Sequence, residues 1–359
     1  MKLILLAAAN SVHTIRWANA FVERGIETHL VSQHAVGAGL SPRVSVHLFP
    51  HFRGAGYFLN HGRLRKLVNA LRPDLLNAHY ATGYGTLADA IHTVPVVLNV
   101  WGSDVYEFPD KGPMHRWFLR RNLRHAAHIV STSKAMAQRT RSLCAGLRDI
   151  TVVPFGVDTS VFQPRVPLAL PSTGTIEIGT VKTLSTIYGI DLLIKAFALV
   201  LRTVPAAHLR IVGGGPEREQ LEQLSRAAGL ADRVQFVGAV PHAQVPNELR
   251  KLDLFVALSR MESFGVAVLE ASACGIPVVV SNVGGLPEVV QAGVSGSIVP
   301  QEDVVAAAER IAWIANSPEI RERMGNAGVA FVHAEYEWSR CVDRMITVLE
   351  NALPQSQKG

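Results

Sequence analysis

Short apolar runs alternate with helical patterns along most of the chain, and this alternation limits the folds that are open to it. Two parallel strands need a crossover between them, usually a helix, so strand–helix alternation predicts parallel sheets. In the first half the runs predict strands over residues 3–6, 28–32, 44–49, 75–78, 96–100 and 129–131, with helices over 17–24 and 64–71.

The second half repeats the same alternation. It predicts strands over residues 176–180, 208–212, 234–237, 254–257, 278–281 and 296–299, with helices over 189–204, 217–228 and 245–252. We therefore expect two Rossmann-like, doubly wound sheets with a cleft between them. Ligands of such sheets bind beyond the carboxyl ends of the strands.

The chain of 359 residues is too long for one ordinary core, which favours two domains. Residues 162–175 are rich in Pro, Ser and Thr and are interpreted as a linker. The predicted limits are residues 1–165, residues 166–335, and a terminal helical stretch in 336–359 that can pack back on the N-terminal domain.

Charge is divided unevenly between the halves. Residues 1–165 carry 19 Lys+Arg against 9 Asp+Glu, and residues 166–359 carry 16 against 20, within a formal net charge of +6. This asymmetry predicts that the halves meet different partners. An apolar content of 48% with 18% charged residues is globular rather than disordered.

The three cysteines have no metal-ligand spacing and give no disulfide framework, which fits a reducing compartment. The first apolar run is short and leads into an amphipathic pattern instead of a cleavage site, and no run reaches membrane-spanning length. We expect a protein that stays in the cytoplasm.

Two carboxylates eight positions apart, Glu262 and Glu270, flank a short turn that ends at Gly265. Ser263 is the predicted cap of a helix that begins there. The amides at the start of that helix would offer a phosphate site. Glu270, in the second turn, could then reach a sugar hydroxyl. A surface turn with one solvated Glu and one salt-bridged Glu explains the same residues, and both interpretations stay open at this point.

Small and polar residues also follow several predicted strands. The turn at residues 213–216 resembles a dinucleotide fingerprint, but Arg218 takes its sixth position and two neighbouring glutamates would repel a pyrophosphate, which argues against NAD. Loops at residues 10–13, 79–83 and 101–104 are polar enough to form a cleft wall.

A strongly basic stretch lies in the first half. Residues 111–148 contain nine Lys or Arg and no Asp or Glu. Within it the arginines of a predicted helix interleave with aromatic residues: Arg116, Trp117, Phe118, Arg120, Arg121 and Arg124. The helix could rest on an anionic membrane surface, hold an acidic acceptor, or be a solvated face with extended arginines. Nucleic acid is less well supported, because no binding motif surrounds the stretch.

The ordered motifs of the second half resemble the retaining glycosyltransferases of family 4, which have the GT-B fold. Glu262 and Glu270 match the E-x7-E pattern of that family. The resemblance extends to residues 211–216 (IVGGGP), 234–238 (VQFVG), 277–281 (PVVVS) and 284–290 (GGLPEVV). The first half is similar more loosely, through residues 24–28 and 153–158.

This resemblance implies an α/β protein of GT-B fold, with two Rossmann-like doubly wound parallel-sheet domains facing a cleft. It implies sugar transfer from a nucleotide-diphosphate-sugar to a glycan, lipid-linked or small-molecule acceptor, with retained configuration, without a metal, in cell-envelope polysaccharide synthesis. The enzyme would be a hexosyl- or N-acetylhexosaminyltransferase, and it could lie peripherally on the inner face of the membrane.

By the same resemblance, Glu270 would hold the ribose of the donor and Glu262 its sugar. The diphosphate would meet backbone amides, and the base would lie near Val240. The remaining donor-binding residues expected are Phe264, Gly265, Val266 and Gly214.

Two positions depart from the family pattern. An Arg and a Lys usually grip the diphosphate, but Thr183 and Tyr188 align there, so Lys182, the only cation of that loop, is assigned the phosphate role. Trp101 stands where many members have a His, so no catalytic His is transferred. His13 and Asp104 are the candidates for acceptor contacts.

Two other functions fit the same fold. One is a nucleotide-sugar 2-epimerase, against which the E-x7-E pattern argues. The other is a nucleotide-sugar-binding protein without transferase activity. The altered Lys182 loop and Trp101 prompt this alternative.

Overall fold

The computed structural model describes residues 1–50, 53–165 and 174–354, and the chain divides into two compact units. The first contains Met1–Phe155 together with Arg340–Gly359, and the second contains Gly156–Ser339. The predicted domain boundary, after residue 165, therefore lies too far along the chain. The terminal stretch, predicted to start at residue 336, joins the first unit only from Arg340. Part of the predicted linker, residues 166–173, lies outside the described residues.

Backbone pairing explains where the units divide. The Val157 amide donates to the Tyr336 carbonyl at 2.7 Å, and the Trp338 amide donates to the Val157 carbonyl at 2.9 Å. Phe162, which we assigned to the linker, is buried at 3% exposure. The chain passes between the units twice, after Phe155 and before Arg340. Beside both places its backbone is hydrogen-bonded within the second unit.

The first unit is built on a seven-stranded parallel sheet with the order β3-β2-β1-β4-β5-β6-β7. Its first strand in the sequence lies inside the sheet and is fully buried from Leu3 to Leu6. The strands are β1 (Lys2–Leu6), β2 (Glu27–Ser32), β3 (Ser45–Leu48), β4 (Leu75–His79), β5 (Val96–Val100), β6 (His128–Ser131) and β7 (Ile150–Val152).

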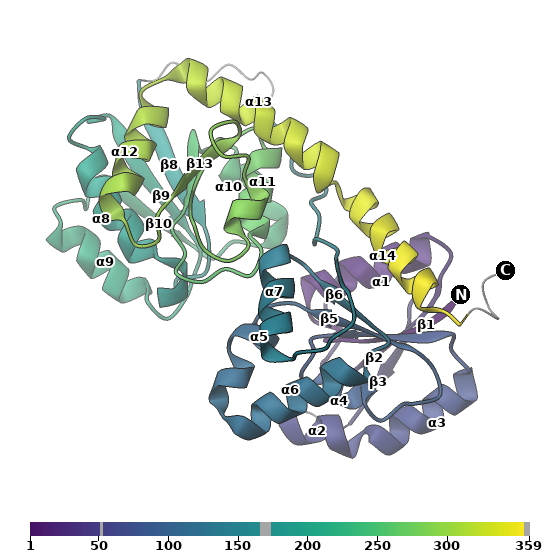
Figure 1. The fold of residues 1–359 in the computed structure, drawn as a ribbon. Helices are drawn as coiled ribbons and strands as arrows, with labels where there is room; N and C mark the ends of the chain where they lie inside the picture. Colours follow the sequence, from purple (N-terminus) through teal and green to yellow (C-terminus); the bar gives the residue numbers. More distant parts are fainter. Residues whose placement is uncertain (51–52, 166–173, 355–359) are drawn as a thin grey trace. The chain divides into compact units, whose positions relative to one another are not determined.

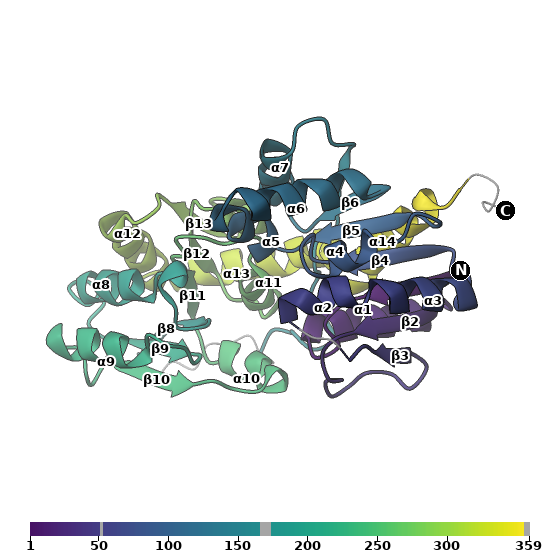
Figure 2. The same cartoon turned by 90° about the horizontal axis from the view of Figure 1, so that it is seen from below.

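Helices cover both faces of this sheet. Helices α1 and α14 lie on one side, and α2, α3 and α6 lie on the other (Figures 1 and 2). Arg24, which follows α1, pairs with Asp343 of α14 at 2.9 Å. The helices are α1 (Val12–Glu23), α2 (Arg53–Leu59), α3 (His61–Leu71), α4 (Tyr84–Ala88), α5 (Ser103–Tyr106), η1 (Phe108–Lys111), α6 (Pro113–His125), α7 (Lys134–Leu143) and α14 (Trp338–Ala352).

The second unit has a six-stranded parallel sheet with the order β10-β9-β8-β11-β12-β13. Its core joins the central strands to α8 and α12 through buried aliphatic residues. The strands are β8 (Ile176–Val181), β9 (Ala207–Val212), β10 (Val234–Gly238), β11 (Leu254–Ala257), β12 (Val278–Ser281) and β13 (Gly296–Val299).

Short helices in this unit connect the strands, and longer ones follow the last strand. They are η2 (Thr186–Tyr188), α8 (Ile190–Val200), α9 (Arg218–Ala227), η3 (His242–Gln244), α10 (Val245–Leu249), α11 (Val266–Ala273), η4 (Leu286–Val289), α12 (Val304–Ala315) and α13 (Pro318–Glu335).

The predicted doubly wound architecture is confirmed, and every predicted strand is present. The alternation did not predict β7 or the helices α2, α4, α5, α7, α12 and α13. Three of these helices carry capping signals, since the side chains of Ser133, Asp303 and Ser317 accept from the amides of Met136, Ala306 and Ile320. None of the helices seen in the described part of the chain is long and apolar enough to cross a membrane.

Replacing Asp303 with Ala should lower the free energy of unfolding by about 1 kcal/mol, because the Ala306 amide loses its 2.9 Å partner. Asp303→Asn is the matched control, since an amide oxygen can also accept this bond. Denaturant unfolding of both variants measures the difference. Equal stability of the Ala and Asn variants would show that the cap contributes nothing.

Candidate functional site

The predicted donor residues of the second unit all follow the carboxyl ends of its strands. Lys182 follows β8, Gly214 follows β9, and Val240 comes after β10. Glu262 lies in the loop between β11 and α11. Because the sheet is parallel, these loops gather at one edge, where doubly wound sheets bind their ligands.

Lys182 and Glu262 form the central contact of this edge. The Lys182 ammonium donates to a Glu262 carboxylate oxygen at 2.5 Å, and the two side chains are only 17% and 10% exposed. The same ammonium lies 4.4 Å from the centre of the Tyr188 ring, within reach of a cation–π attraction. The lysine proposed from sequence and the first glutamate of the motif are therefore brought together.

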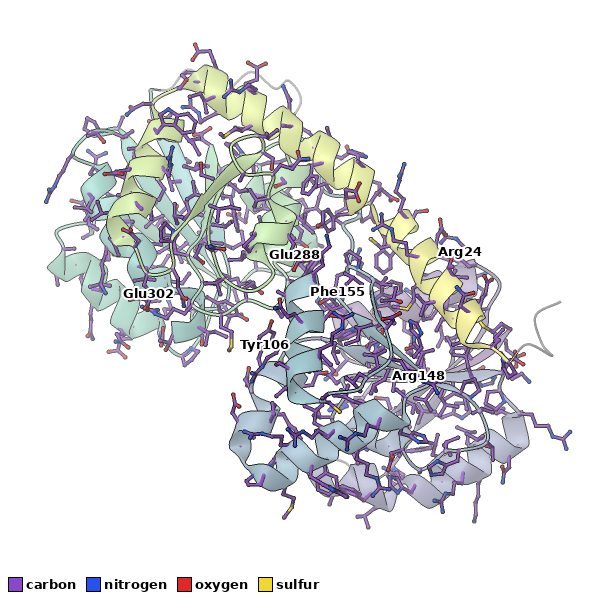
Figure 3. The ribbon with its side chains drawn as sticks, in the orientation of Figure 1. Arg24, Tyr106, Arg148, Phe155, Glu288 and Glu302 are labelled. Atoms are coloured by element: carbon purple, nitrogen blue, oxygen red, sulfur yellow. The ribbon has the colours of Figure 1, made fainter. Side chains whose placement is uncertain are left out.

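A second ion-pair network holds the loop that carries Glu262. Arg260 donates from two nitrogens to the two carboxylate oxygens of Asp191, each at 2.8 Å, and it also reaches Glu302 at 2.7 Å (Glu302 is labelled in Figure 3). Burial alone would raise the pKa of Asp191, but the hydrogen bonds from Arg260 and Lys195 lower it. The network fixes the backbone two residues before Glu262.

Two glycine turns pack tightly against the loops of Lys182 and Glu262. At Gly213 (φ +147°) an added Cβ would lie 1.8 Å from the Lys182 carbonyl oxygen, and at Gly284 (φ +52°) it would lie 1.9 Å from the Glu262 carbonyl oxygen. Only glycine fits at either position. At Gly213, within the turn at residues 213–216, the space beside the Cα is therefore filled by the Lys182 backbone and is not open to a ligand.

The helix after Glu262 begins at Val266; its N-cap residue is Gly265, whose φ is +112°, and no side chain caps it. The prediction that Ser263 is the cap is therefore wrong, because Gly265, two residues later, occupies that position. First-turn amides lack an intrahelical carbonyl partner, so those of Val266 and Ala267 point out of the N-terminus of α11 with its partial positive charge.

Glu270 lies on α11 one turn further along and is 7% exposed. One carboxylate oxygen lies 3.3 Å from the His242 Nε2, and His242 itself is about half exposed. Glu270 is thus a buried carboxylate with one partner at the surface, which a ligand hydroxyl could replace.

The other expected donor residues differ in what they can offer. The Phe264 side chain is buried beside Tyr336, with ring centres 6.0 Å apart, so only its backbone faces the loop. Val266, Gly214 and Val240 are partly exposed. Their roles toward a donor stay predictions.

His13, the first acceptor candidate, belongs to an aromatic cluster in the first unit. Its ring stacks on Phe155 with centres 4.4 Å apart, and Trp101 packs against Phe155 at 5.0 Å (Phe155 is labelled in Figure 3). The buried His79 lies 4.1 Å from Trp101, and burial together with the charge of His13 lowers the pKa of His79 to about 3. His79 is therefore a neutral part of this cluster at neutral pH.

Asp104, the second acceptor candidate, is 1% exposed and organises a loop. Its carboxylate accepts from the amides of Ala81 and Gly102 at 2.8 Å each and from the Trp101 amide at 3.2 Å. Burial raises its pKa, and these amide bonds oppose the rise. This placement gives Asp104 a structural role, and contact with an acceptor stays a prediction.

Sequence reasoning missed several residues of the site. Tyr188 was noted only as a departure from the family pattern, while Arg260, His242 and the packing role of Gly284 carried no signal of their own. Arg260, His242 and Gly284 each act through a neighbour distant in sequence, whereas Tyr188 contacts Lys182 of its own loop. Within residues 1–50, 53–165 and 174–354, no group of three or more His, Cys, Asp or Glu side chains could hold a metal ion.

Comparison with known proteins places both halves in one enzyme group. The family model described as "Glycosyl transferases group 1" matches residues 169–331, and "Glycosyl transferase 4-like" matches residues 2–133. The chain is 28% identical to a subunit of the phosphatidylinositol N-acetylglucosaminyltransferase of Arabidopsis thaliana, over 93% of this chain and 80% of the relative.

Other relatives match over a shorter part. A D-inositol 3-phosphate glycosyltransferase of Segniliparus rotundus is 34% identical over 63% of this chain and 52% of its own length. A GDP-mannose-dependent phosphatidylinositol monomannoside mannosyltransferase of Mycobacterium tuberculosis is 31% identical over 66% of this chain and 65% of its own.

Solved structures show the same fold. The sucrose-phosphate synthase of Thermosynechococcus elongatus superposes with a TM-score of 0.84 at 20% identity, covering 98% of both chains. The Anabaena protein HepE, in complex with UDP, gives 0.82 at 20% identity over 98% of this chain and 100% of its own. These structures show the GT-B fold, and the two family models show that the chain belongs to the family 4 type of glycosyltransferases.

Proposed function

We propose that this glycosyltransferase moves a sugar from a nucleotide-diphosphate-sugar to a glycan, lipid-linked or small-molecule acceptor, with retention and without a metal. The observation that carries the proposal is the Lys182–Glu262 pair, 2.5 Å long, in the loops beside the N-terminus of α11. A cation, a carboxylate and a helix N-terminus then meet at the ligand-binding edge of one sheet.

The leaving group explains the need for a cation and a helix N-terminus. When the bond between the anomeric carbon and the diphosphate oxygen breaks, negative charge grows on that oxygen. The first amides of α11 and the Lys182 ammonium can stabilise this charge without a metal. An ammonium has three N–H donors, so Lys182 can keep its bond to Glu262 and still bind a phosphate oxygen.

The two glutamates would act on different parts of the donor. Glu262, held by Lys182, would orient the sugar hydroxyls and stabilise positive character at the anomeric carbon. Glu270, one turn into the helix, would accept hydrogen bonds from the ribose in place of His242. The proposal that the sugar keeps its anomeric configuration rests on the E-x7-E pattern of family 4, which Glu262 and Glu270 match.

The names of relatives support a lipid-linked acceptor in particular. Two of those compared are named for transfer to phosphatidylinositol or its mannoside. HepE binds UDP and UDP-glucose, whereas the mycobacterial relative is named for GDP-mannose. Envelope polysaccharide synthesis is the process that we propose for such a transfer.

A donor panel tests the proposal directly. A thermal-shift screen with UDP, GDP, UDP-glucose, UDP-N-acetylglucosamine and GDP-mannose should identify a stabilising ligand, since about 100 times its dissociation constant adds roughly 2.7 kcal/mol. If none of these nucleotides stabilises the protein, the proposed donor class is wrong.

Lys182→Ala should reduce turnover with the best donor by about 100-fold or more. The variant lacks the positive charge that would stabilise the leaving diphosphate oxygen. Lys182→Arg, which keeps the charge, should lose less. Release of nucleoside diphosphate measures both variants. Undiminished turnover in Lys182→Ala would contradict the assigned role.

Glu262→Gln should lower kcat while donor binding persists, because the neutral amide cannot stabilise positive character at the anomeric carbon. Glu309→Gln, at an exposed site on α12, is the matched control and should behave as wild type. Turnover and the donor thermal shift are measured on both. A kcat equal to wild type in Glu262→Gln would refute this assignment.

Glu270→Gln should act on donor affinity instead, with roughly 10- to 100-fold weaker binding, because hydrogen bonds to a charged acceptor are lost. His242→Ala is the companion variant: it removes the partner of Glu270 but leaves the carboxylate, so its effect should be smaller. Calorimetric titration with nucleoside diphosphate gives both affinities. An equal loss in the two variants would mean that the Glu270–His242 contact, not a ribose contact, matters.

A further inference from the structure

One face of α6 in the first unit carries the exposed arginine and aromatic side chains that the sequence singled out. Its buried side packs Leu119, Asn122 and Leu123 against the core. The opposite side forms a surface groove, which we call the α6 face, lined by Pro113, Arg116, Trp117, Arg120, Arg121 and Arg124.

Part of this face is fixed in place. The Arg121 guanidinium pairs with the buried Asp89 at 2.8 Å and lies 5.6 Å from the Trp117 ring centre. The Arg120 Nε donates to the Leu143 carbonyl at 2.7 Å. Arg116 and Arg124 lie on the same face. The protein therefore orients two of the four arginines, Arg120 and Arg121, so the face is not simply a row of solvated side chains.

Large apolar side chains extend the face toward solvent. Trp117 is 54% exposed and Met114, one turn before it, is 69% exposed. Phe118 packs against Phe58 of α2 with ring centres 5.4 Å apart, and the next residue of α2, Leu59, is 62% exposed. An apolar strip therefore runs from α6 to the end of α2, beside the arginines.

We propose that the α6 face, with the end of α2, docks on an anionic lipid bilayer. Arginines bind lipid phosphates, while a tryptophan and aliphatic side chains enter the boundary between headgroups and acyl chains, the pattern of interfacial amphipathic helices. A nucleic acid would bind the arginines but would leave Met114 and Leu59 in water. This inference rests on the proposed lipid-linked acceptor, which the docking would bring within reach of the first unit.

The test is co-sedimentation of the full chain with vesicles. Wild type should sediment with phosphatidylserine-rich vesicles and not with pure phosphatidylcholine vesicles. Arg116→Glu with Arg124→Glu should weaken this binding about tenfold or more, since each surface cation contributes measurably to attraction by anionic lipid. Neither side chain holds an ion pair or hydrogen bond found among the described residues, so the variant should fold, which circular dichroism checks.

A matched control carries the same charge change elsewhere in the first unit. Arg43 and Arg148 are exposed and outside α6 (Arg148 is labelled in Figure 3), and reversing both should leave binding near wild type. A second readout is the blue shift of tryptophan emission on vesicle addition, which Trp117→Phe should abolish. Equal loss in the control variant, or an unchanged shift in Trp117→Phe, would overturn the proposal.

Two further arms separate the alternatives. Binding of wild type to a single-stranded oligonucleotide, without binding to vesicles, would make the α6 face a nucleic-acid site and the proposal wrong. Nucleoside diphosphate release from the best donor, measured without vesicles, should be unchanged in Arg116→Glu with Arg124→Glu. Loss of the donor-dependent thermal shift with intact vesicle binding would refute the proposed function alone.

Discussion

The largely buried ion pair between Lys182 and Glu262 is the interaction on which the rest of the second unit's ligand-binding edge depends. Removing charge from water is costly, so such a pair is stable only when its geometry is held, and loss of one partner leaves the other charge uncompensated. The Arg260 network, the Tyr188 ring and two glycine turns hold it. The surrounding loops are therefore shaped by an electrostatic requirement more than by hydrophobic packing.

The two units divide the work of the molecule by charge. In the acidic second half, Lys182 and the N-terminus of α11 follow neighbouring strands of the sheet, at the place that we propose for a diphosphate. The basic first half spreads its arginines over a helix surface, where an extended anionic partner fits better than a small one. The charge asymmetry in the sequence thus fits the two kinds of recognition that we propose: a compact phosphate site and an extended surface.

The strands and the architecture were predictable because buried parallel strands are near-continuous apolar runs. The predicted pair Glu262 and Glu270 does lie on the loop and helix expected. The contacts that hold Glu262 and its loop in place, however, could not be predicted from the sequence. Arg260 meets Asp191, 69 positions earlier, and Lys182 meets Glu262, 80 positions later. Such pairings depend on which strands are neighbours in the sheet, and periodicity carries no information about strand order. The Ser263 cap failed for a local reason, since the N-cap residue of the helix is Gly265.

The first unit is discontinuous in the chain, because Arg340–Gly359 joins it only after the whole second unit has been traversed. During synthesis, all strands of both sheets have been made once β13 ends at Val299, whereas the first unit still lacks α14 (Trp338–Ala352). Until Asp343 reaches Arg24, the face of the first sheet that α14 covers lies open to other chains and to chaperones. The segment that completes the first unit therefore follows every strand of both sheets in the sequence.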